Sequence, residues 1–505
     1  MTRREFIAAG AAAGSLYGQT DGRLHRLPES DAHYRRVRDY VEDVPVPGYR
    51  WASEQAYEAF RDMKYGIRLH WGPYSILRQR NESWPFLTMP FEERQRYQQM
   101  YRTWNPREFD ADAWTDLFAE CGMRMFAFTS KHHDGFSMFN TSTRVRRRAN
   151  WTAAGGPRME DCDLAYSMAE TPFRRDVVGE LCAAARKRGL KIDLYFSHPD
   201  WYDADFRPYN CAPLQVPSSA TLDARSYPDV PKRLGDRIVT VPDPSPAEVD
   251  RMMARHRAQL TELLTNYGRI DMLCLDQWFG PSVWPQLRET ILHLRKLQPD
   301  VMLRARGIGN YGDYYTPEGF VPGNKENTDT PWFVIYPLGS SFSYESDAAL
   351  HKGPQWIVSN IIDCAAKGGN FMVGVGPDGD GQFHPTAKEQ LRDAGAWLRI
   401  NGAAIYATRE RKGDPWREGD NIRFTRAKDN KTVYAFALSW PGRTLNLISV
   451  VPRSGSSVHL LGYAQPLAWK VDPGAGLTID LPEELQDESR RPCRFAWAFS
   501  IPTDV

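Results

Sequence analysis

The sequence predicts an α/β fold: a (β/α)8-like TIM barrel followed by an antiparallel β-sandwich domain. Between about residues 52 and 400, short apolar runs alternate with amphipathic stretches. Such runs are typical of parallel strands that are covered by helices on both faces. Six or more of these units favour a barrel over an open sheet, and no G-x-G-x-x-G follows the first strand. After about residue 405, strand-like runs follow one another without helices, which indicates the sandwich.

The elements of the barrel follow in chain order. Between 110 and 122, apolar residues recur at i, i+3, i+4 and i+7, and Asp110 is suited to cap this helix. Thr171 and Pro172 suit the opening of a helix over 171–189. The expected strands are 66–71, 123–130, 190–197, 269–276, 301–306 and 370–376, and the other expected helices are 246–267, 283–297 and 353–367.

Three further segments differ from this alternation. Residues 421–440 predict two strands joined by a polar turn at Lys428–Lys431. Segments 140–172 and 198–245 are rich in Pro, Asp and Ser and lack periodicity. They predict long loops at strand ends, where barrel enzymes bind their substrates.

The N-terminus resembles an export signal. Arg3 and Arg4 precede the apolar run Phe6–Ala13, which is typical of a twin-arginine signal and too short to remain as a membrane anchor. We therefore expect an exported protein, periplasmic or extracellular, with no membrane contact after export. The expected division is a signal peptide and linker over 1–30, a catalytic barrel over 31–404 and a sandwich over 405–505.

Composition narrows the class of partner. The net charge of +1 gives no reason to expect nucleic acid or an anionic membrane surface as a partner. The aromatic content of 12% suits carbohydrate, because sugar rings present apolar C–H faces that pack on aromatic planes. None of the seven cysteines lies in a C-x-x-C pair, so no zinc site is indicated.

The informative pattern is that polar residues stand at the carboxyl ends of the expected strands. These residues are His70, His132, His133, Tyr195, Asp276, Arg304 and Arg306. In a parallel barrel these strand ends form one rim, and the active site lies there. Burying so many polar groups is costly unless something pairs with them. A ligand rich in hydroxyl groups is one explanation, and a metal bound by the histidines is the other.

Asp276 is the strongest candidate for a reactive group, because it follows the apolar run Met272–Leu275 and is followed by Gln277 and Trp278. Cleavage of a glycoside with retention needs a second carboxyl group about 5–5.5 Å from the first. The candidates on mouth loops are Glu82, Glu318, Glu326 and Asp329. Glu318 stands in GDYYTPEGF, where Tyr and Pro neighbours can desolvate it and so suit it to donate a proton.

Six separated motifs occur in the order KYGIRLHWGPYSI (64–76), FDADAWTDLFAECGMRMFAFTSKHHDGF (109–136), IDLYFSHPDWY (192–202), IDMLCLDQWFG (270–280), GGNFMVGVGPDGDG (368–381) and WLRINGAAIYATR (397–409). Together they resemble glycoside hydrolase family 29, the retaining α-L-fucosidases. The resemblance implies a barrel, a C-terminal sandwich and no metal or other cofactor. It implies that Asp276 is the nucleophile and Glu318 the acid/base. It also implies that His70, His132, His133, Tyr195 and Arg306 bind sugar hydroxyls, and we expect Trp84 and Trp278 to pack near the ring.

The sequence therefore predicts a retaining exo-α-L-fucosidase that acts on fucosylated oligosaccharides or glycoconjugates by double displacement. Two alternatives stay open beside it: an exo-glycosidase on a fucose-like sugar such as an α-L-galactoside, and a non-catalytic fucose-binding relative. A metal-dependent hydrolase is a further alternative. The oligomeric state does not follow from the sequence.

Overall fold

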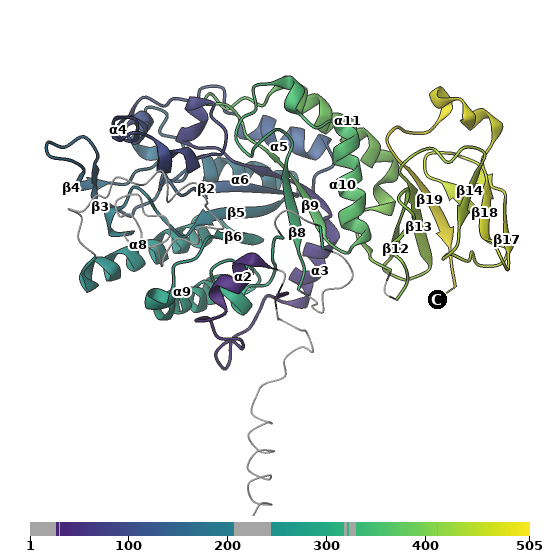
Figure 1. Cartoon of the computed structure of the whole chain (residues 1–505), viewed down its shortest axis with the longest axis horizontal. Helices are drawn as coiled ribbons and strands as arrows, with labels where there is room; N and C mark the ends of the chain where they lie inside the picture. The colour runs from purple at the N-terminus through teal and green to yellow at the C-terminus, as the bar shows by residue number, and fades with distance from the viewer. Residues whose placement is uncertain are drawn as a thin grey trace, which may run out of the picture.

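The structure is a computed structural model that describes residues 27–29, 31–206, 244–317, 321–322, 330–411 and 413–504. Its larger part is built on a seven-stranded parallel sheet with the order β7-β6-β5-β2-β1-β9-β8 (Figure 1). The strands are β1 (Tyr65–Leu69), β2 (Met125–Lys131), β5 (Lys191–Ser197), β6 (Met272–Asp276), β7 (Met302–Leu303), β8 (Phe333–Pro337) and β9 (Asn370–Val375). The parallel sheet and the six strands expected from the apolar runs are thereby confirmed.

Helices connect and cover these strands. They are α2 (Ala32–Val37), α3 (Glu54–Met63), α4 (Phe91–Tyr97), α5 (Ala111–Glu120), α6 (Val177–Lys187), α8 (Pro246–Thr265), α9 (Trp284–Leu297), α10 (Pro354–Ala366) and α11 (Pro385–Asn401). Asp110 caps α5 as expected, since its side chain accepts a hydrogen bond from Ala113 N. Ser245 and Glu248 form a capping box that begins α8.

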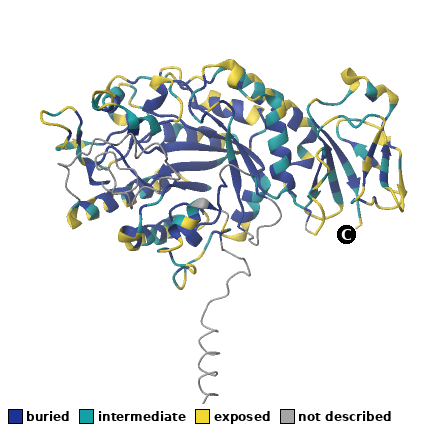
Figure 2. Cartoon of the chain, viewed as in Figure 1, coloured by how far each residue is buried: buried dark blue, intermediate teal, exposed yellow. Residues whose placement is uncertain are grey.

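The strands of the parallel sheet are buried along nearly their whole length, which explains why they are apolar at consecutive positions (Figure 2). One charged pair interrupts this core: Arg68 in β1 and Asp193 in β5 are fully buried, with a separation of 3.9 Å. Because buried charges need partners, this pair links two strands on the inside of the sheet.

The C-terminal part contains two antiparallel sheets, beyond α10 and α11 in Figure 1. Their strands are β10 (Thr408–Arg409), β11 (Arg417–Glu418), β12 (Ile422–Ala427), β13 (Thr432–Ala437), β14 (Thr444–Leu447), β15 (Val458–Leu460), β16 (Pro466–Leu467), β17 (Trp469–Asp472), β18 (Gly476–Asp480) and β19 (Trp497–Pro502). Phe424 and Phe499 of one sheet share a buried cluster with Leu447 and Ile479 of the other. An antiparallel C-terminal domain is therefore confirmed.

Three details of the expected secondary structure were wrong. The helix predicted to open at Thr171 begins at Val177, because the carboxylate of Asp176 accepts from Gly179 N and caps it there. Segment 140–172 contains an antiparallel hairpin, β3 (Val145–Asn150) with β4 (Arg158–Leu164), in place of a long loop. Strand β8 was not predicted at all. The segment 207–243, most of the second predicted loop, lies outside the described residues.

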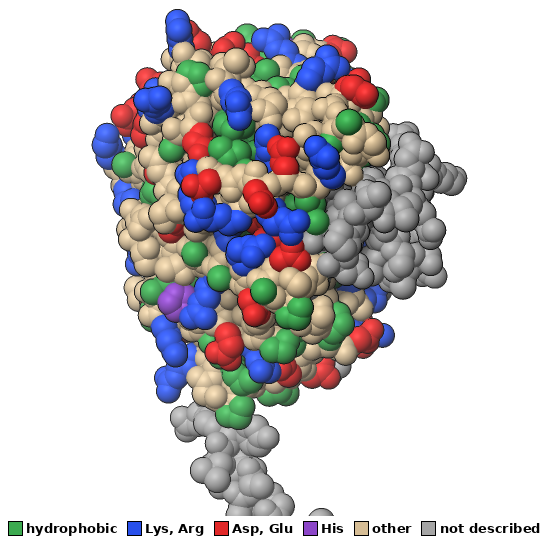
Figure 3. Space-filling view, turned by 90° about the vertical axis from the view of Figure 1, so that its left-hand side faces the viewer, with side chains coloured by type: hydrophobic (Ala, Val, Ile, Leu, Met, Phe, Trp, Pro, Cys, Tyr) green, Lys and Arg blue, Asp and Glu red, His purple; other side chains and the backbone are tan. Residues whose placement is uncertain are grey.

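The strands run toward the end of the molecule that carries α4 and the β3–β4 hairpin (Figure 1). Seen from this end, basic and acidic side chains are interspersed, as the near-zero net charge suggests (Figure 3). Of the helices in the described ranges, none combines the length and the apolar character that crossing a bilayer requires.

Candidate active site

A cavity of about 570 Å³ opens at the carboxyl ends of the parallel strands. The predicted site residues that line it are His70, Trp84, His132, His133, Tyr195, Asp276, Trp278 and Arg306. They converge because parallel pairing aligns the strand ends: Ser197 of β5 stands beside Asp276 of β6, and His198 N donates to Asp276 O at 3.0 Å. Glu318 lies outside the described residues, although Thr316 and Pro317 directly before it line the cavity.

Asp276 is surrounded by hydrogen-bond donors. Its Oδ1 accepts from Arg306 Nη1 at 2.8 Å and from Arg304 Nη1 at 3.1 Å, and its Oδ2 accepts from the Tyr195 hydroxyl at 2.7 Å. Burial alone would raise the pKa of this carboxyl, but Arg306 and Arg304 outweigh burial and hold the pKa well below its usual range. Asp276 is therefore an ionised, oriented carboxylate, as a nucleophile must be.

Three neutral histidines stand beside this carboxylate. Burial lowers the pKa of His70 and of His132 well below the ordinary value, and it lowers the pKa of His133 to about 4. The Ser83 hydroxyl lies 2.6 Å from His132 Nδ1 and fixes that ring, while His133 Nε2 lies 3.6 Å from Asp276 Oδ2. A neutral imidazole both donates and accepts, which suits the hydroxyl groups of a sugar.

Aromatic rings pack on the histidines, and two of them, Trp84 and Phe342, line the cavity. The ring of Trp84 lies 4.7 Å from that of His133, centroid to centroid, and Trp201 stacks on His133 at 5.2 Å. On the other side, Phe342 stacks on His70 at 5.0 Å. Flat apolar faces beside oriented polar groups are the combination that a carbohydrate ring requires.

Comparison with known proteins matches these features to a family. The α-L-fucosidase family model matches residues 47–403, and the model of the α-L-fucosidase C-terminal domain matches residues 418–502. The chain belongs to the α-L-fucosidase family. Among its relatives, the tissue α-L-fucosidase of Homo sapiens is 28% identical over 472 residues, which cover 88% of each chain. The plasma α-L-fucosidase of Homo sapiens is 26% identical over 88% of this chain and 89% of its own length.

Solved structures of α-L-fucosidases share the fold. Isoenzyme 1 from Paenibacillus thiaminolyticus is 25% identical, with a TM-score of 0.70 over 90% of this chain and 99% of that one. A GH29 enzyme from Bacteroides thetaiotaomicron, trapped as a covalent intermediate with 2-fluoro-fucosyl fluoride, is 21% identical, with a TM-score of 0.68 over 90% and 97% of the two chains.

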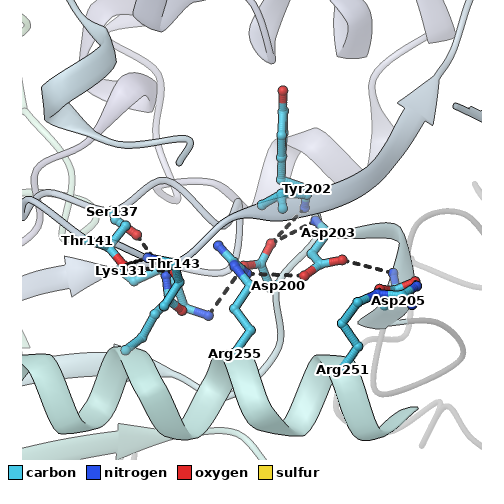
Figure 4. Close-up of polar contacts among 12 residues, drawn as sticks. Lys131, Ser137, Thr141, Thr143, Asp200, Tyr202, Asp203, Asp205, Arg251 and Arg255 are labelled. Atoms are coloured by element: carbon cyan, nitrogen blue, oxygen red, sulfur yellow. Dashed lines mark hydrogen bonds and ion pairs between the residues drawn. The ribbon is translucent and has the colours of Figure 1, made fainter. Parts of the chain in front are cut away.

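In this fucosidase family member, the sequence SKHHDGF is held by a buried ionic network, defined here as Lys131, Asp200, Asp203 and Arg255 (Figure 4). Arg255 Nη1 of α8 lies 2.7 Å from Asp200 Oδ2 and 3.3 Å from Asp203 Oδ2, and Lys131 Nζ lies 3.5 Å from Asp200 Oδ2. Burial alone would raise the pKa of Asp200, but Lys131 and Arg255 keep it below the ordinary value, at about 2. The network therefore fixes the loop that begins at Asp200.

That loop in turn positions the histidines. Trp201 N donates to His133 O at 2.8 Å, so the loop and the histidine pair form one unit. Gly135 makes the close approach possible, because it has a φ of +83° and a Cβ there would come within 2.0 Å of Asp200 Oδ1. The glycine of SKHHDGF is thus explained by the packing of the two loops.

Glu82 is a functional candidate that was considered from the sequence but not chosen. Its side chain is 6% exposed and lines the cavity together with Trp84, so both residues of this loop reach the site. Burial raises the pKa of Glu82 to about 7, although the Ser343 hydroxyl, 3.3 Å from Oε1, opposes this effect. Glu82 can therefore carry a proton at neutral pH.

Other residues that line the cavity were missed as site residues: His33, Arg36, Arg68, Gln277, Tyr336 and Phe342. Arg304, which belongs to the strand-end pattern, lines the cavity as well, although no role was predicted for it. Arg68 could have been recognised from the sequence, because a charged residue inside an apolar strand must have a partner. His33 and Arg36 could not, because a helix of six residues has no clear periodicity. No group of three or more His, Cys, Asp or Glu side chains in the described ranges is arranged to hold a metal ion.

Proposed function

We propose that this member of the α-L-fucosidase family removes terminal α-L-fucosyl residues from glycans by a double displacement with retention. The observation that carries the proposal is the ionised carboxylate of Asp276, which Arg304, Arg306 and Tyr195 hold at a cavity lined by neutral histidines. The covalent intermediate of the Bacteroides thetaiotaomicron relative supports the same order of steps.

In the first step, a carboxylate oxygen of Asp276 attacks the anomeric carbon. The bond from that carbon to the leaving oxygen breaks, and the acid/base residue gives the oxygen its proton. In the second step, water attacks the anomeric carbon of the glycosyl ester, the acid/base residue takes the proton of the water, and the carboxylate of Asp276 is restored. His70, His132 and His133 orient the ring hydroxyls throughout, and Trp84 and Trp278 pack beside the ring.

Glu318 is our proposal for the acid/base, and Glu82 is a second candidate because its pKa of about 7 leaves about half of its carboxyl groups protonated at neutral pH. Replacing the acid/base residue with glutamine should slow hydrolysis of a disaccharide by about 10²–10⁴-fold, since its leaving oxygen needs the proton. With an activated aryl fucoside, azide should restore turnover, because azide attacks the glycosyl-enzyme without a base. We expect azide rescue in Glu318→Gln and not in Glu82→Gln; rescue in Glu82→Gln alone would move the role to Glu82.

Glu82 also gives the activity a defined pH dependence. The protonated form can donate a hydrogen bond inside the cavity, and the protonated fraction falls about tenfold for each pH unit above a pKa of about 7. We therefore expect kcat/KM of the wild type to decline above about pH 7. In Glu82→Gln the side chain is neutral at every pH, so this alkaline limb should move upward; an unchanged limb would show that another group sets it.

The choice of sugar is tested by release from a panel of aryl glycosides. We expect release from the aryl α-L-fucoside at a rate at least tenfold above that from the α-L-galactoside, which adds a hydroxyl at C6. Binding without release would favour the non-catalytic alternative, and loss of activity on chelation would favour the metal-dependent one. The first product, followed by NMR, should be the α anomer, because two inversions give retention.

We also propose the finer architecture and the location. A backbone bridge joins Tyr314 to Arg304, which directly follows the edge strand β7. A second bridge joins the neighbouring Tyr315 to Trp332, which directly precedes β8, the strand at the other edge of the sheet. These bridges support closure of the sheet into a (β/α)8-like barrel, and the cluster shared by the two C-terminal sheets supports a β-sandwich.

The division at 1–30, 31–404 and 405–505 and export to the periplasm or the medium remain predictions, since residues 1–26 lie outside the described ranges.

A further inference from the structure

The short helix α2 and the segment around it are anchored to the rim of the cavity. Leu27 N donates to Asn310 Oδ1 at 3.0 Å, and Asn310 Nδ2 donates to Asp43 O at 2.8 Å. Val37 of α2 is fully buried, and a Cβ on Gly309 would meet Val41 Cγ1 at 2.9 Å. The segment is thus firmly packed on the loop that follows β7, although it precedes the residues matched by the family model.

This packing places two side chains of α2 at the cavity. His33 and Arg36 both line it, next to Trp278 from the loop after β6. The guanidinium carbon of Arg36 lies 4.4 Å from the ring centroid of Trp278, and the ring of His33 lies 6.2 Å from the same indole ring. A cation stacked on an indole face gives a flat surface whose rim can donate hydrogen bonds.

The position of this surface relative to a bound sugar follows from the strand order and from the geometry of the displacement. His70 and His132 follow β1 and β2, whereas Asp276 ends β6 and Arg304 directly follows β7, on the other side of β5. The anomeric carbon must lie next to Asp276, and the ring hydroxyls reach toward the histidines. Because Asp276 attacks the anomeric carbon from the opposite face, the leaving group points away from this buried carboxylate, toward the cavity mouth. The partly exposed residues His33, Arg36 and Trp278 line the cavity there.

We infer that α2 and Trp278 form the subsite for the leaving group, and that the group bound there is a second sugar ring. This inference rests on the proposed function. A sugar ring packs its C–H face against the part of the partly exposed Trp278 indole that Arg36 does not cover, while the guanidinium of Arg36 and the imidazole of His33 meet its hydroxyls. Burial lowers the pKa of His33 well below its ordinary value, so this imidazole is neutral and can accept as well as donate.

The test compares two substrates of one donor sugar: a fucosyl disaccharide, whose leaving group fills the proposed subsite, and α-L-fucosyl fluoride, whose leaving group is a single atom. In His33→Ala and Arg36→Ala, the ratio of kcat/KM for the disaccharide to kcat/KM for the fluoride should fall at least fivefold. Arg38→Ala is the matched control, because Arg38 caps the same helix, is exposed and does not line the cavity. Its ratio should stay within twofold of the wild type.

A second readout does not depend on how much of a variant is folded. With fucosyl fluoride as donor and a saccharide as acceptor, the glycosyl-enzyme reacts either with water or with a hydroxyl of the acceptor. In the transfer reaction the hydroxyl oxygen attacks the anomeric carbon, the ester bond to Asp276 breaks, and the acid/base residue takes the hydroxyl proton. The fraction of transfer product should fall at least threefold in Arg36→Ala. If both the kcat/KM ratio and the fraction of transfer product were unchanged in the variants, the subsite would be overturned. A wild type that is inactive on the fluoride and on the disaccharide would overturn the proposed function instead.

Discussion

Asp276→Asn should lower kcat/KM on an aryl α-L-fucoside by at least about 10⁴-fold, or about 5.4 kcal/mol at 1.36 kcal/mol per decade. The amide keeps the shape of the side chain but cannot form the glycosyl ester. Arg304 and Arg306 lose a negative partner in this variant, so a thermal unfolding curve is needed to show that the variant is folded at the assay temperature. Steady-state rates against the same aryl fucoside provide the measurement.

Asp271→Asn is the matched control for this variant. Asp271 directly precedes β6, at the end of the strand away from the cavity, where its carboxylate accepts from Lys191 Nζ at 2.9 Å and Ile192 N at 3.1 Å. We expect less than a threefold change in kcat/KM. If Asp276→Asn were folded and retained more than a tenth of the wild-type rate, Asp276 could not be the nucleophile.

Arg255→Met should lower the free energy of unfolding by about 3–5 kcal/mol. Arg255 is 6% exposed and is the shared cation of Asp200 and Asp203, which are themselves 1% and 4% exposed. Removing one partner of a buried ionic group leaves an uncompensated charge. The free-energy cost of this unpaired charge is larger than the net stabilisation that the intact pair contributes. Urea unfolding followed by tryptophan fluorescence measures the change.

Arg257→Met on the same helix is the control, because Arg257 is exposed and its loss should cost less than about 1 kcal/mol. Arg255→Met should also reduce activity, since Asp200 supports the loop that binds His133 O through Trp201 N. Equal stability of the two methionine variants would show that the buried network has no such role.

The core of the cavity could be predicted from sequence because parallel strands carry their ends to one place. Asp276 and His70 stand directly after apolar runs, and nothing more than the alignment of parallel strands is needed to bring them to one cavity. The role of Arg304 was harder to foresee, because the two-residue β7 gives no sign of which arginine faces the carboxylate. The structure shows that both arginines bind Asp276 Oδ1.

The parts that could not be predicted depend on tertiary contacts. Strand β8 was missed because the described residues between it and β7 contain no α-helix, only the short 3-10 helix Gly309–Tyr311. The alternation on which the prediction relied is therefore not seen there. Strand β8 brings Tyr336 to the cavity, and Phe342 follows on the next loop. Helix α2 is held by Asn310, which is remote in sequence. The raised pKa of Glu82 comes from burial, which local sequence does not show.

Covalent attachment of the sugar to Asp276 is tested by labelling with 2-fluoro-fucosyl fluoride followed by peptide mass spectrometry. The fluorine at C2 slows hydrolysis of the ester more than its formation when fluoride is the leaving group, so the intermediate accumulates. We expect one added 2-fluorofucosyl group, on the peptide that contains Asp276, and no labelling of Asp276→Asn. A label on another carboxylate, or turnover of the reagent with inversion, would contradict this role of Asp276.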